Sequence, residues 1–226
     1  MKGKLIVVGG TDCSGKETQT KLLKENLEKE NILVKRLFFP RYDTPTGKII
    51  GGPLLGKKDI GECIFPEGID VIPEVASLYY AADRKYNVEE IIDYLNKGYV
   101  VILDRYVESN MAHQAGKIFD KEKRHKMYDF ISTLEYDLLE LPKPDLTLFL
   151  YMPFEKTIEL LEKRSEKADK SEESEVYLKN SEKTYLEMCE LFKYKQINCV
   201  KENNIRTIED INDEMVKIVK DFLQNK

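Results

Sequence analysis

The chain contains no tryptophan, two histidines and only four cysteines among its 226 residues. Cys13, Cys63, Cys189 and Cys199 lack C-x-x-C spacing, and the histidines do not complete a zinc pattern with them. This spacing favours reduced thiols over a disulfide framework or a structural zinc site. No apolar run approaches the roughly 18 residues of a membrane span, and the segment before Leu5 is too short and polar for a signal peptide. We therefore expect a cytoplasmic protein with no membrane partner.

The chain has no large excess of positive or negative charge, because its 36 basic and 41 acidic side chains leave a net charge of only -5. This balance argues against a general nucleic-acid binder but is compatible with a single phosphate-binding cleft. With 42% hydrophobic residues, the chain is long enough to bury a substantial core.

A glycine-rich stretch follows the apolar run Leu5–Val8 near the start of the chain. Its residues are Gly9, Gly10, Thr11, Asp12, Cys13, Ser14, Gly15, Lys16, Glu17 and Thr18. A strand, such a loop and a following helix from Gln19 form the context of a phosphate-binding P-loop. Glycines let successive backbone N–H groups turn around phosphate oxygens, while the helix N-terminus and Lys16 add positive charge. The alternative is a glycine-rich turn without function, which the Gly15-Lys16 pair in this context disfavours.

The stretch departs from the P-loop pattern at one position. Glu17 stands where a Mg²⁺-binding hydroxyl is expected, and Thr18 comes one residue later. How Mg²⁺ is held is therefore open at this point.

The rest of the chain alternates between short apolar runs and segments with helical periodicity. This alternation predicts one α/β domain over residues 1–226, with a parallel sheet of about five strands between two layers of helices. The strands are expected near residues 5–8, 34–39, 99–103, 146–151 and 196–200. Helices are expected near 19–29, 73–97, 108–118, 120–140, 154–163, 177–193 and 207–222, with a loop containing short helical pieces over 47–73. The polar segment 164–174 is interpreted as a mobile lid over the site rather than as a linker.

Asp104 and Arg105 end the apolar run that begins at Tyr99. Functional groups collect at the carboxyl ends of parallel strands. Asp104 can hold Mg²⁺ or its water, and Arg105 can bind an acceptor phosphate through two parallel hydrogen bonds. The alternative is a purely structural Asp–Arg pair.

Two groups of side chains share helical faces with suitable chemistry for a nucleotide. Tyr80 and Arg84 are four residues apart and offer a stacking surface and a donor to a base carbonyl. Taken alone, such a pair is more often part of the core edge and the solvated surface. Asn110, His113 and Gln114 share a face after Arg105. A general base is unnecessary when the acceptor is an ionised phosphate, so we interpret His113 as a sugar or base contact.

Five motifs in this order, between about Lys4 and Phe222, resemble those of the thymidylate kinases. They are Gly10-Thr-Asp12-x-x-Gly15-Lys16-x-Thr18-Gln19, Phe39-Pro40-Arg41-Tyr42, Asp83-Arg84, Asp104-Arg105-Tyr106-x-x-Ser109-Asn110 and Leu141-Pro142-Lys143-Pro144-Asp145. The P-loop alone is generic, whereas the combination is specific. The resemblance implies transfer of the γ-phosphoryl group of Mg·ATP to dTMP for dTTP biosynthesis, in a homodimer packed through helices.

The resemblance also implies a role for each matching residue. Residues 10–18 would bind ATP, with Lys16 bridging the β- and γ-phosphates, and Asp12 would approach the sugar 3′-hydroxyl. Asp12, Thr18 and Asp104 are the metal-site candidates. Arg105 would hold the dTMP phosphate, and the remaining dTMP contacts would come from Phe39, Tyr42, Tyr80, Arg84, Asn110, His113 and Gln114.

Two further positions bear on catalysis and specificity. Kinases of this family carry a charge-neutralising arginine in the P-loop or the lid, and this P-loop has none. The resemblance therefore implies that Arg164 is catalytic together with Asp12, Lys16 and Arg105. His113 stands where a tyrosine often excludes a 2′-hydroxyl, which puts strict deoxyribose selection in question. The alternatives left open are a kinase for dUMP, dGMP or a nucleoside, and a nucleotide-binding regulatory protein without kinase activity.

Overall fold

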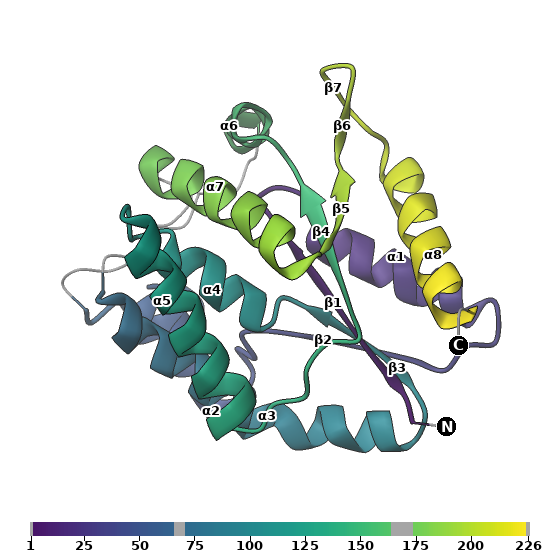
Figure 1. The fold of residues 1–226 in the computed structure, drawn as a ribbon, viewed down its shortest axis with the longest axis horizontal. Helices are drawn as coiled ribbons and strands as arrows, with labels where there is room; N and C mark the ends of the chain where they lie inside the picture. Colours follow the sequence, from purple (N-terminus) through teal and green to yellow (C-terminus); the bar gives the residue numbers. More distant parts are fainter. Residues whose placement is uncertain (1, 66–70, 164–173, 225–226) are drawn as a thin grey trace.

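The computed structural model describes residues 2–65, 71–163 and 174–224. Five parallel strands form the central sheet in the order β2-β3-β1-β4-β5 (Figure 1). Their bounds are Lys4–Gly10 for β1, Val34–Phe38 for β2, Val100–Asp104 for β3, Leu146–Tyr151 for β4 and Lys195–Asn198 for β5. The prediction of a five-stranded parallel sheet is therefore confirmed. In the register of the sheet, Val8 of β1 pairs with Asp104 at the end of β3. Asp104 therefore lies at the same edge of the sheet as the loop that follows β1.

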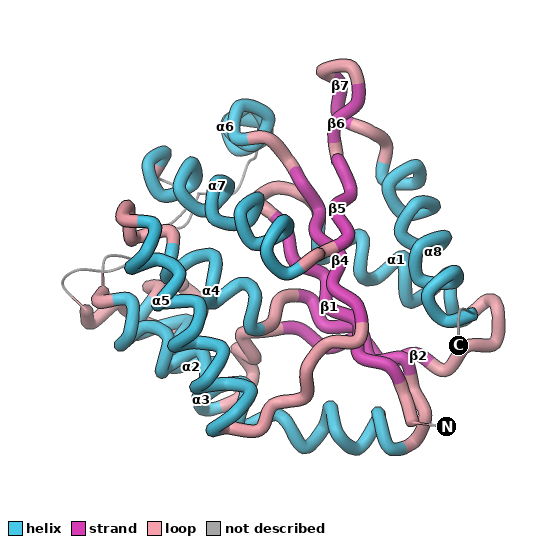
Figure 2. Tube along the Cα trace, in the orientation of Figure 1, coloured by secondary structure: helices cyan, strands magenta, loops and turns pink. Residues whose placement is uncertain are grey.

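Helices cover both faces of the sheet (Figures 1 and 2). Successive apolar residues of β1 point to opposite faces, so both faces must be covered. Ile6 and Val8 point into a core that includes residues of α1 (Lys16–Glu28) and α8 (Ile208–Gln224). Leu5 and Val7 point into the other core, which is built from α3 (Pro73–Asn96), α4 (Val107–Ala115), α5 (Lys121–Ser132) and α7 (Glu175–Phe192). Because side chains alternate along a strand, the apolar residues Leu5–Val8 of β1 serve both cores.

Smaller elements complete the described fold. They are α2 (Pro45–Ile49), the π-helical turns η1 (Ile50–Leu54) and η3 (Thr133–Leu138), α6 (Phe154–Lys163), and the hairpin of β6 (Val200–Lys201) and β7 (Asn204–Ile205). Within the described ranges, no helix combines the length and apolar character needed to cross a membrane.

The end of one expected helix and the end of one expected strand differ from the structure. The helix expected over 120–140 ends its regular α-helical part at Ser132 and continues as η3. There the N–H of Leu139 bonds to the carbonyl of Leu134, five residues back, and the N–H of Leu141 bonds to that of Glu135. The strand expected over 196–200 ends at Asn198; the N–H of Cys199 still bonds to the carbonyl of Tyr151 at the end of β4, and Val200 belongs to β6.

Candidate active site

The loop after β1 has the conformation that phosphate binding requires. Gly15 adopts a φ of 75°, in the left-handed region that favours glycine, immediately before α1 begins at Lys16. Gly10 has no room for a side chain, because a Cβ atom there would lie 2.7 Å from the carbonyl oxygen of Leu150 and 2.7 Å from Ser14 Oγ. Thr11 fixes the loop to β4, since its hydroxyl donates to Met152 O and accepts from Met152 N, both at 2.8 Å.

Lys16 folds back over this loop. Its Nζ donates to the carbonyls of Gly10 (3.0 Å) and Thr11 (2.7 Å), and it lies 3.4 Å from Ser14 Oγ. Burial lowers the pKa of Lys16 to about 8, and the Arg105 cation acts in the same direction. The loop therefore holds a buried amine whose positive charge is only partly compensated, which favours the arrival of an anion.

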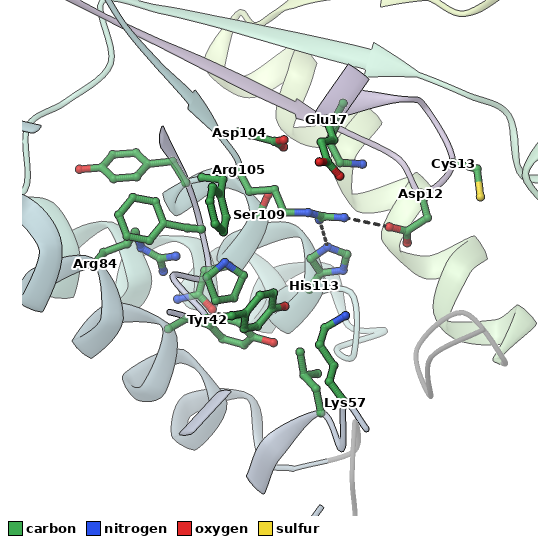
Figure 3. A pocket seen from close by; sticks show the side chains of 18 of the residues that line it. Asp12, Cys13, Glu17, Tyr42, Lys57, Arg84, Asp104, Arg105, Ser109 and His113 are labelled. Atoms are coloured by element: carbon green, nitrogen blue, oxygen red, sulfur yellow. Dashed lines mark hydrogen bonds and ion pairs between the residues drawn. The ribbon is translucent and has the colours of Figure 1, made fainter. Parts of the chain in front are cut away.

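A chain of hydrogen bonds links Asp12 to α7 across the cleft, and Figure 3 shows its first two links, from Asp12 to Arg105 and from Arg105 to His113. Arg105 Nη2 donates to Asp12 Oδ1 at 3.1 Å, and Arg105 Nη1 lies 3.1 Å from His113 Nε2. His113 Nδ1 lies 3.0 Å from the hydroxyl of Tyr177, whose ring stacks on the imidazole. Burial opposes ionisation of Asp12, but the Arg105 and Lys16 cations together outweigh it and lower the pKa of Asp12.

The protonation of His113 follows from its partners. Burial lowers the pKa of His113 to about 4, so the imidazole is neutral near pH 7. Arg105 can only donate hydrogen bonds, so Nε2 of His113 is the acceptor and Nδ1 carries the proton. Because a neutral imidazole that accepts from a guanidinium is a poor proton acceptor for chemistry, His113 orients Arg105.

Asp104 lies at the end of β3, beside the P-loop helix. Its Oδ2 accepts from Nη2 of Arg36 at 2.8 Å, and Nε of Arg36 donates to Thr20 Oγ1 at 2.7 Å. The two charged side chains are 14% and 10% exposed, so this is a largely buried ion pair. Arg36 comes from β2 and was not among the candidate residues. Arg36 lies in an ordinary strand, 68 residues before Asp104, so no pattern in the sequence indicated that the two residues would pair.

At the other end of the cleft, Arg84 of α3 is held by Glu135 of η3. Nε and Nη2 of Arg84 both donate to the Glu135 carboxylate, the second at 2.6 Å. Asn110 Nδ2 donates to the same carboxylate at 2.9 Å. The Oδ1 atom of Asn110 and the Oε1 atom of Gln114 are buried without a hydrogen-bond partner in the described structure. Since such groups are nearly always satisfied, they are available to a ligand that donates hydrogen bonds.

Most of the residues described above line one cleft of about 590 Å³. Of the predicted site residues, the cleft brings together Asp12, Cys13, Gly15, Lys16, Glu17, Thr18, Phe39, Tyr42, Tyr80, Arg84, Asp104, Arg105, Asn110, His113 and Gln114. Gly10, Thr11 and Ser14 support the loop from behind, and Arg164 lies outside the described residues, together with residues 165–173 of the predicted lid. Arg36 and Tyr177 also line the cleft, although the sequence did not single them out.

Glu17 and Thr18 are exposed at the start of α1. The Glu17 carboxylate pairs with Lys21 at 2.6 Å, one helical turn later, and this hydrogen bond lowers the pKa of Glu17. Glu17 is therefore a solvated side chain at the rim of the cleft. The geometry gives Thr18 no buried position beside Asp104, which instead has Thr20 near it at 3.4 Å.

The hydrogen-bond donors and carboxylates of the cleft suit ATP and Mg²⁺ to different degrees. Backbone N–H groups at the loop, the α1 N-terminus and Lys16 fit a polyphosphate. No cluster of three or more His, Cys, Asp or Glu side chains that could hold a metal occurs among the residues described. Mg²⁺ often binds through substrate phosphates, water and only one or two carboxylates. The site therefore fits a metal that arrives with the nucleotide rather than one held by the protein alone.

The five-stranded parallel sheet, the P-loop after β1 and the arginine after β3 define a P-loop kinase that acts on a small phosphate-bearing acceptor. Comparisons with known proteins agree: the family model described as thymidylate kinase matches residues 8–212. The chain therefore belongs to the thymidylate kinase family, and it transfers a phosphoryl group from ATP to dTMP to give dTDP.

Individual relatives cover nearly the whole chain. A probable thymidylate kinase of Pyrococcus abyssi is 30% identical over 97% of both chains. The thymidylate kinase of Schizosaccharomyces pombe is 28% identical over 96% of this chain and 92% of its own. A solved structure of thymidylate kinase from Candida albicans superposes with a TM-score of 0.73 at 27% identity, covering 97% of this chain and 92% of that one.

Proposed function

We propose that this kinase binds ATP on the P-loop and dTMP across the cleft, with the acceptor phosphate on Arg105 and the base between Tyr80, Arg84 and Asn110. The observation that carries the proposal is the position of Arg105. Its guanidinium contacts both Asp12 of the P-loop and His113 of α4, and it lines the same cleft as Arg84. A bound phosphate at Arg105 would thus be adjacent to the ATP phosphates and within the same cavity as the base site.

In this phosphoryl transfer the protein mainly positions the two substrates and stabilises charge, and it needs to supply little covalent chemistry. An acceptor phosphate is already ionised near neutral pH, so no general base is required. Lys16 exchanges its bonds to the Gly10 and Thr11 carbonyls for phosphate oxygens, and Arg105 orients the acceptor. His113 holds Arg105 from behind, and Asp12 offers its carboxylate to the substrate hydroxyl as the arginine turns to the phosphate.

Mg²⁺ would accompany ATP and compensate the charge of the transferred group. Asp12 and Asp104 supply the carboxylates nearest the P-loop, and their contacts favour binding through water. Asp104 is already paired with Arg36, so its remaining capacity suits a water ligand more than direct coordination. Thr20, which lies next to Asp104, is better placed than Thr18 to support that arrangement.

We also propose a homodimer in the cytoplasm, packed through α3. Leu78, Ala82 and Tyr86 recur at four-residue spacing and form an exposed face, on which Leu78 is 51% and Tyr86 59% exposed. Light scattering on Tyr86→Glu should show a monomer. Ile208→Glu, which places the same charge on an exposed apolar position of α8, should leave the dimer intact. A dimer in both variants would refute this interface.

One kinetic experiment tests the assignment of the acceptor phosphate. Arg105→Lys retains the charge but loses the two parallel hydrogen bonds to a phosphate. We expect kcat/KM for dTMP to fall at least about 100-fold, because two charge-assisted hydrogen bonds contribute about 1.5–3 kcal/mol each, while ATP affinity changes little. An unchanged KM for dTMP together with a large loss of ATP affinity would place Arg105 at the donor instead.

A further inference from the structure

The amide of Asn110 is locked in one orientation. Its Nδ2 atom donates to Glu135 Oε1 at 2.9 Å and to the backbone carbonyl of Ser77 at 3.3 Å. Both partners can only accept, so the nitrogen must face them and the oxygen must face away. Asn110 is 3% exposed and lines the cleft, and its Oδ1 atom has no partner in the described structure.

Glu135 also fixes the neighbouring Arg84. The carboxylate is fully buried, and it takes the Nε and Nη2 donors of Arg84, which is itself 3% exposed. Within the part of the chain that the structure describes, the Glu135 oxygens together accept three hydrogen bonds, two from Arg84 and one from Asn110. One carboxylate outside the cleft lining therefore sets the direction of two side chains within it.

We propose that Glu135 is a specificity-determining positioning residue that makes the base site require a ring N–H. This inference rests on the proposed function, in which Arg84 and Asn110 contact the base. A carbonyl oxygen locked toward the base accepts from the N3–H of thymine or uracil. With cytosine, the same oxygen would face the lone pair of the unprotonated N3, and the N–H donors of Arg84 would face the amino group. Neither pair can form a hydrogen bond. Because a buried acceptor left unpaired costs about 1–3 kcal/mol, dTMP and dUMP are favoured over dCMP.

The turn η3 explains how Glu135 reaches this position. Its carbonyl accepts from the N–H of Leu141 at 3.0 Å, six residues later, where the chain leaves the helix for β4. Wide turns of this kind are frequent at functional sites, where they redirect a side chain. Glu135 thus acts through Arg84 and Asn110 and does not itself line the cleft.

The test is the ratio of kcat/KM for dTMP to kcat/KM for dCMP in the full-length enzyme and in Glu135→Gln. A glutamine cannot accept from both Arg84 and Asn110 without turning its own NH₂ group toward one of them. We expect the dTMP:dCMP ratio to fall at least about 10-fold, within the range of one unpaired buried group. The dTMP:dUMP ratio should not change, because thymine and uracil share N3–H and O4.

Glu187→Gln is the matched control. Glu187 makes a similar arginine–carboxylate pair with Arg124, between α7 and α5, which is partly buried, and neither residue lines the cleft. A purely structural role for Glu135 would make both variants less stable or slower with every substrate at constant ratio. If Glu135→Gln does not fold, Glu135→Asp keeps the charge opposite Arg84 but is one methylene shorter, and the same fall is expected.

Two outcomes separate this inference from the proposed base site. A dTMP:dCMP ratio within about twofold of the unmodified enzyme in a folded Glu135 variant overturns the role of Glu135. Asn110→Ser then decides the remaining question. If that variant loses the preference for dTMP over dCMP, the base site stands without Glu135. If it keeps the preference, the base does not contact Asn110, and the proposed function is wrong at this end of the cleft.

Discussion

Binding of ATP to this kinase should take up a proton through Lys16. Burial and the nearby Arg105 cation lower the pKa of Lys16 to about 8, so at pH 9 about nine-tenths of the free enzyme carries a neutral amine. Bound phosphates stabilise the ammonium form and return its pKa toward the usual value of about 10.4. We therefore expect an uptake of about 0.1 proton at pH 7, about 0.5 at pH 8 and about 0.9 at pH 9.

The sign of the linked effect on affinity follows directly. Since the ATP-bound form holds the proton more tightly, the affinity for ATP falls as the pH rises through 8 and approaches a tenfold loss per pH unit above it. Restoring the Lys16 pKa by about 2.5 units corresponds to about 3 kcal/mol of coupling between the proton and the nucleotide.

Titration calorimetry without dTMP, in two buffers with different ionisation enthalpies, measures this uptake. The experiment is best done in a Cys13→Ser background, which removes the ionisable thiol of the loop. Lys16→Arg is the control, since arginine stays charged throughout this range and should show almost no uptake. Uptake below about 0.2 proton at pH 9, or equal uptake in Lys16→Arg, would refute the reasoning.

Further predictions concern the charges around the P-loop. Arg164→Ala should lower kcat about 1000-fold in single-turnover assays while leaving the Kd for dTMP within a few-fold; a near-normal kcat refutes its catalytic assignment. Arg36→Leu leaves the buried Asp104 carboxylate unpaired and should cost about 3 kcal/mol of unfolding free energy in EDTA, partly restored by Mg²⁺ in urea denaturation. A loss below about 1 kcal/mol would show that the ion pair contributes little. Thiol labelling of Cys13 should slow when ATP is bound, and equal rates with and without ATP would contradict its place in the nucleotide site. Glu17→Ser should leave the Mg²⁺ dependence of the rate unchanged or improved, because Glu17 is exposed and pairs only locally with Lys21; a large loss would mean that Glu17 has its own task.

The P-loop could be predicted from sequence because it depends on neighbouring residues. Gly10, Gly15 and Lys16 act through local backbone geometry and the start of one helix, so their spacing alone specifies the phosphate site. The parallel strands were also accessible, since β1 and β3 are short apolar runs that are almost fully buried, and the other strands recur between segments of helical periodicity.

Contacts between distant elements were not accessible in the same way. The pairing of Arg36 with Asp104 joins β2 to β3 and depends on the strand order β2-β3-β1. The contact of Tyr177 with His113 joins α7 to α4 over 64 residues. Neither Arg36 nor Tyr177 belongs to a recognisable motif. Each occupies an ordinary strand or helix position that becomes part of the cleft only when the elements pack together.

The sequence by itself determined the fold class, the phosphate-binding loop and the arginine that follows β3, because each is written in residues close along the chain or in a simple periodicity. Tertiary structure alone decided the electrostatics of the cleft: which carboxylates are already paired, why His113 is neutral, and how Glu135 orients Arg84 and Asn110. The physical reason is that pKa values and hydrogen-bond directions depend on burial and on partners brought together from different elements, and packing supplies both.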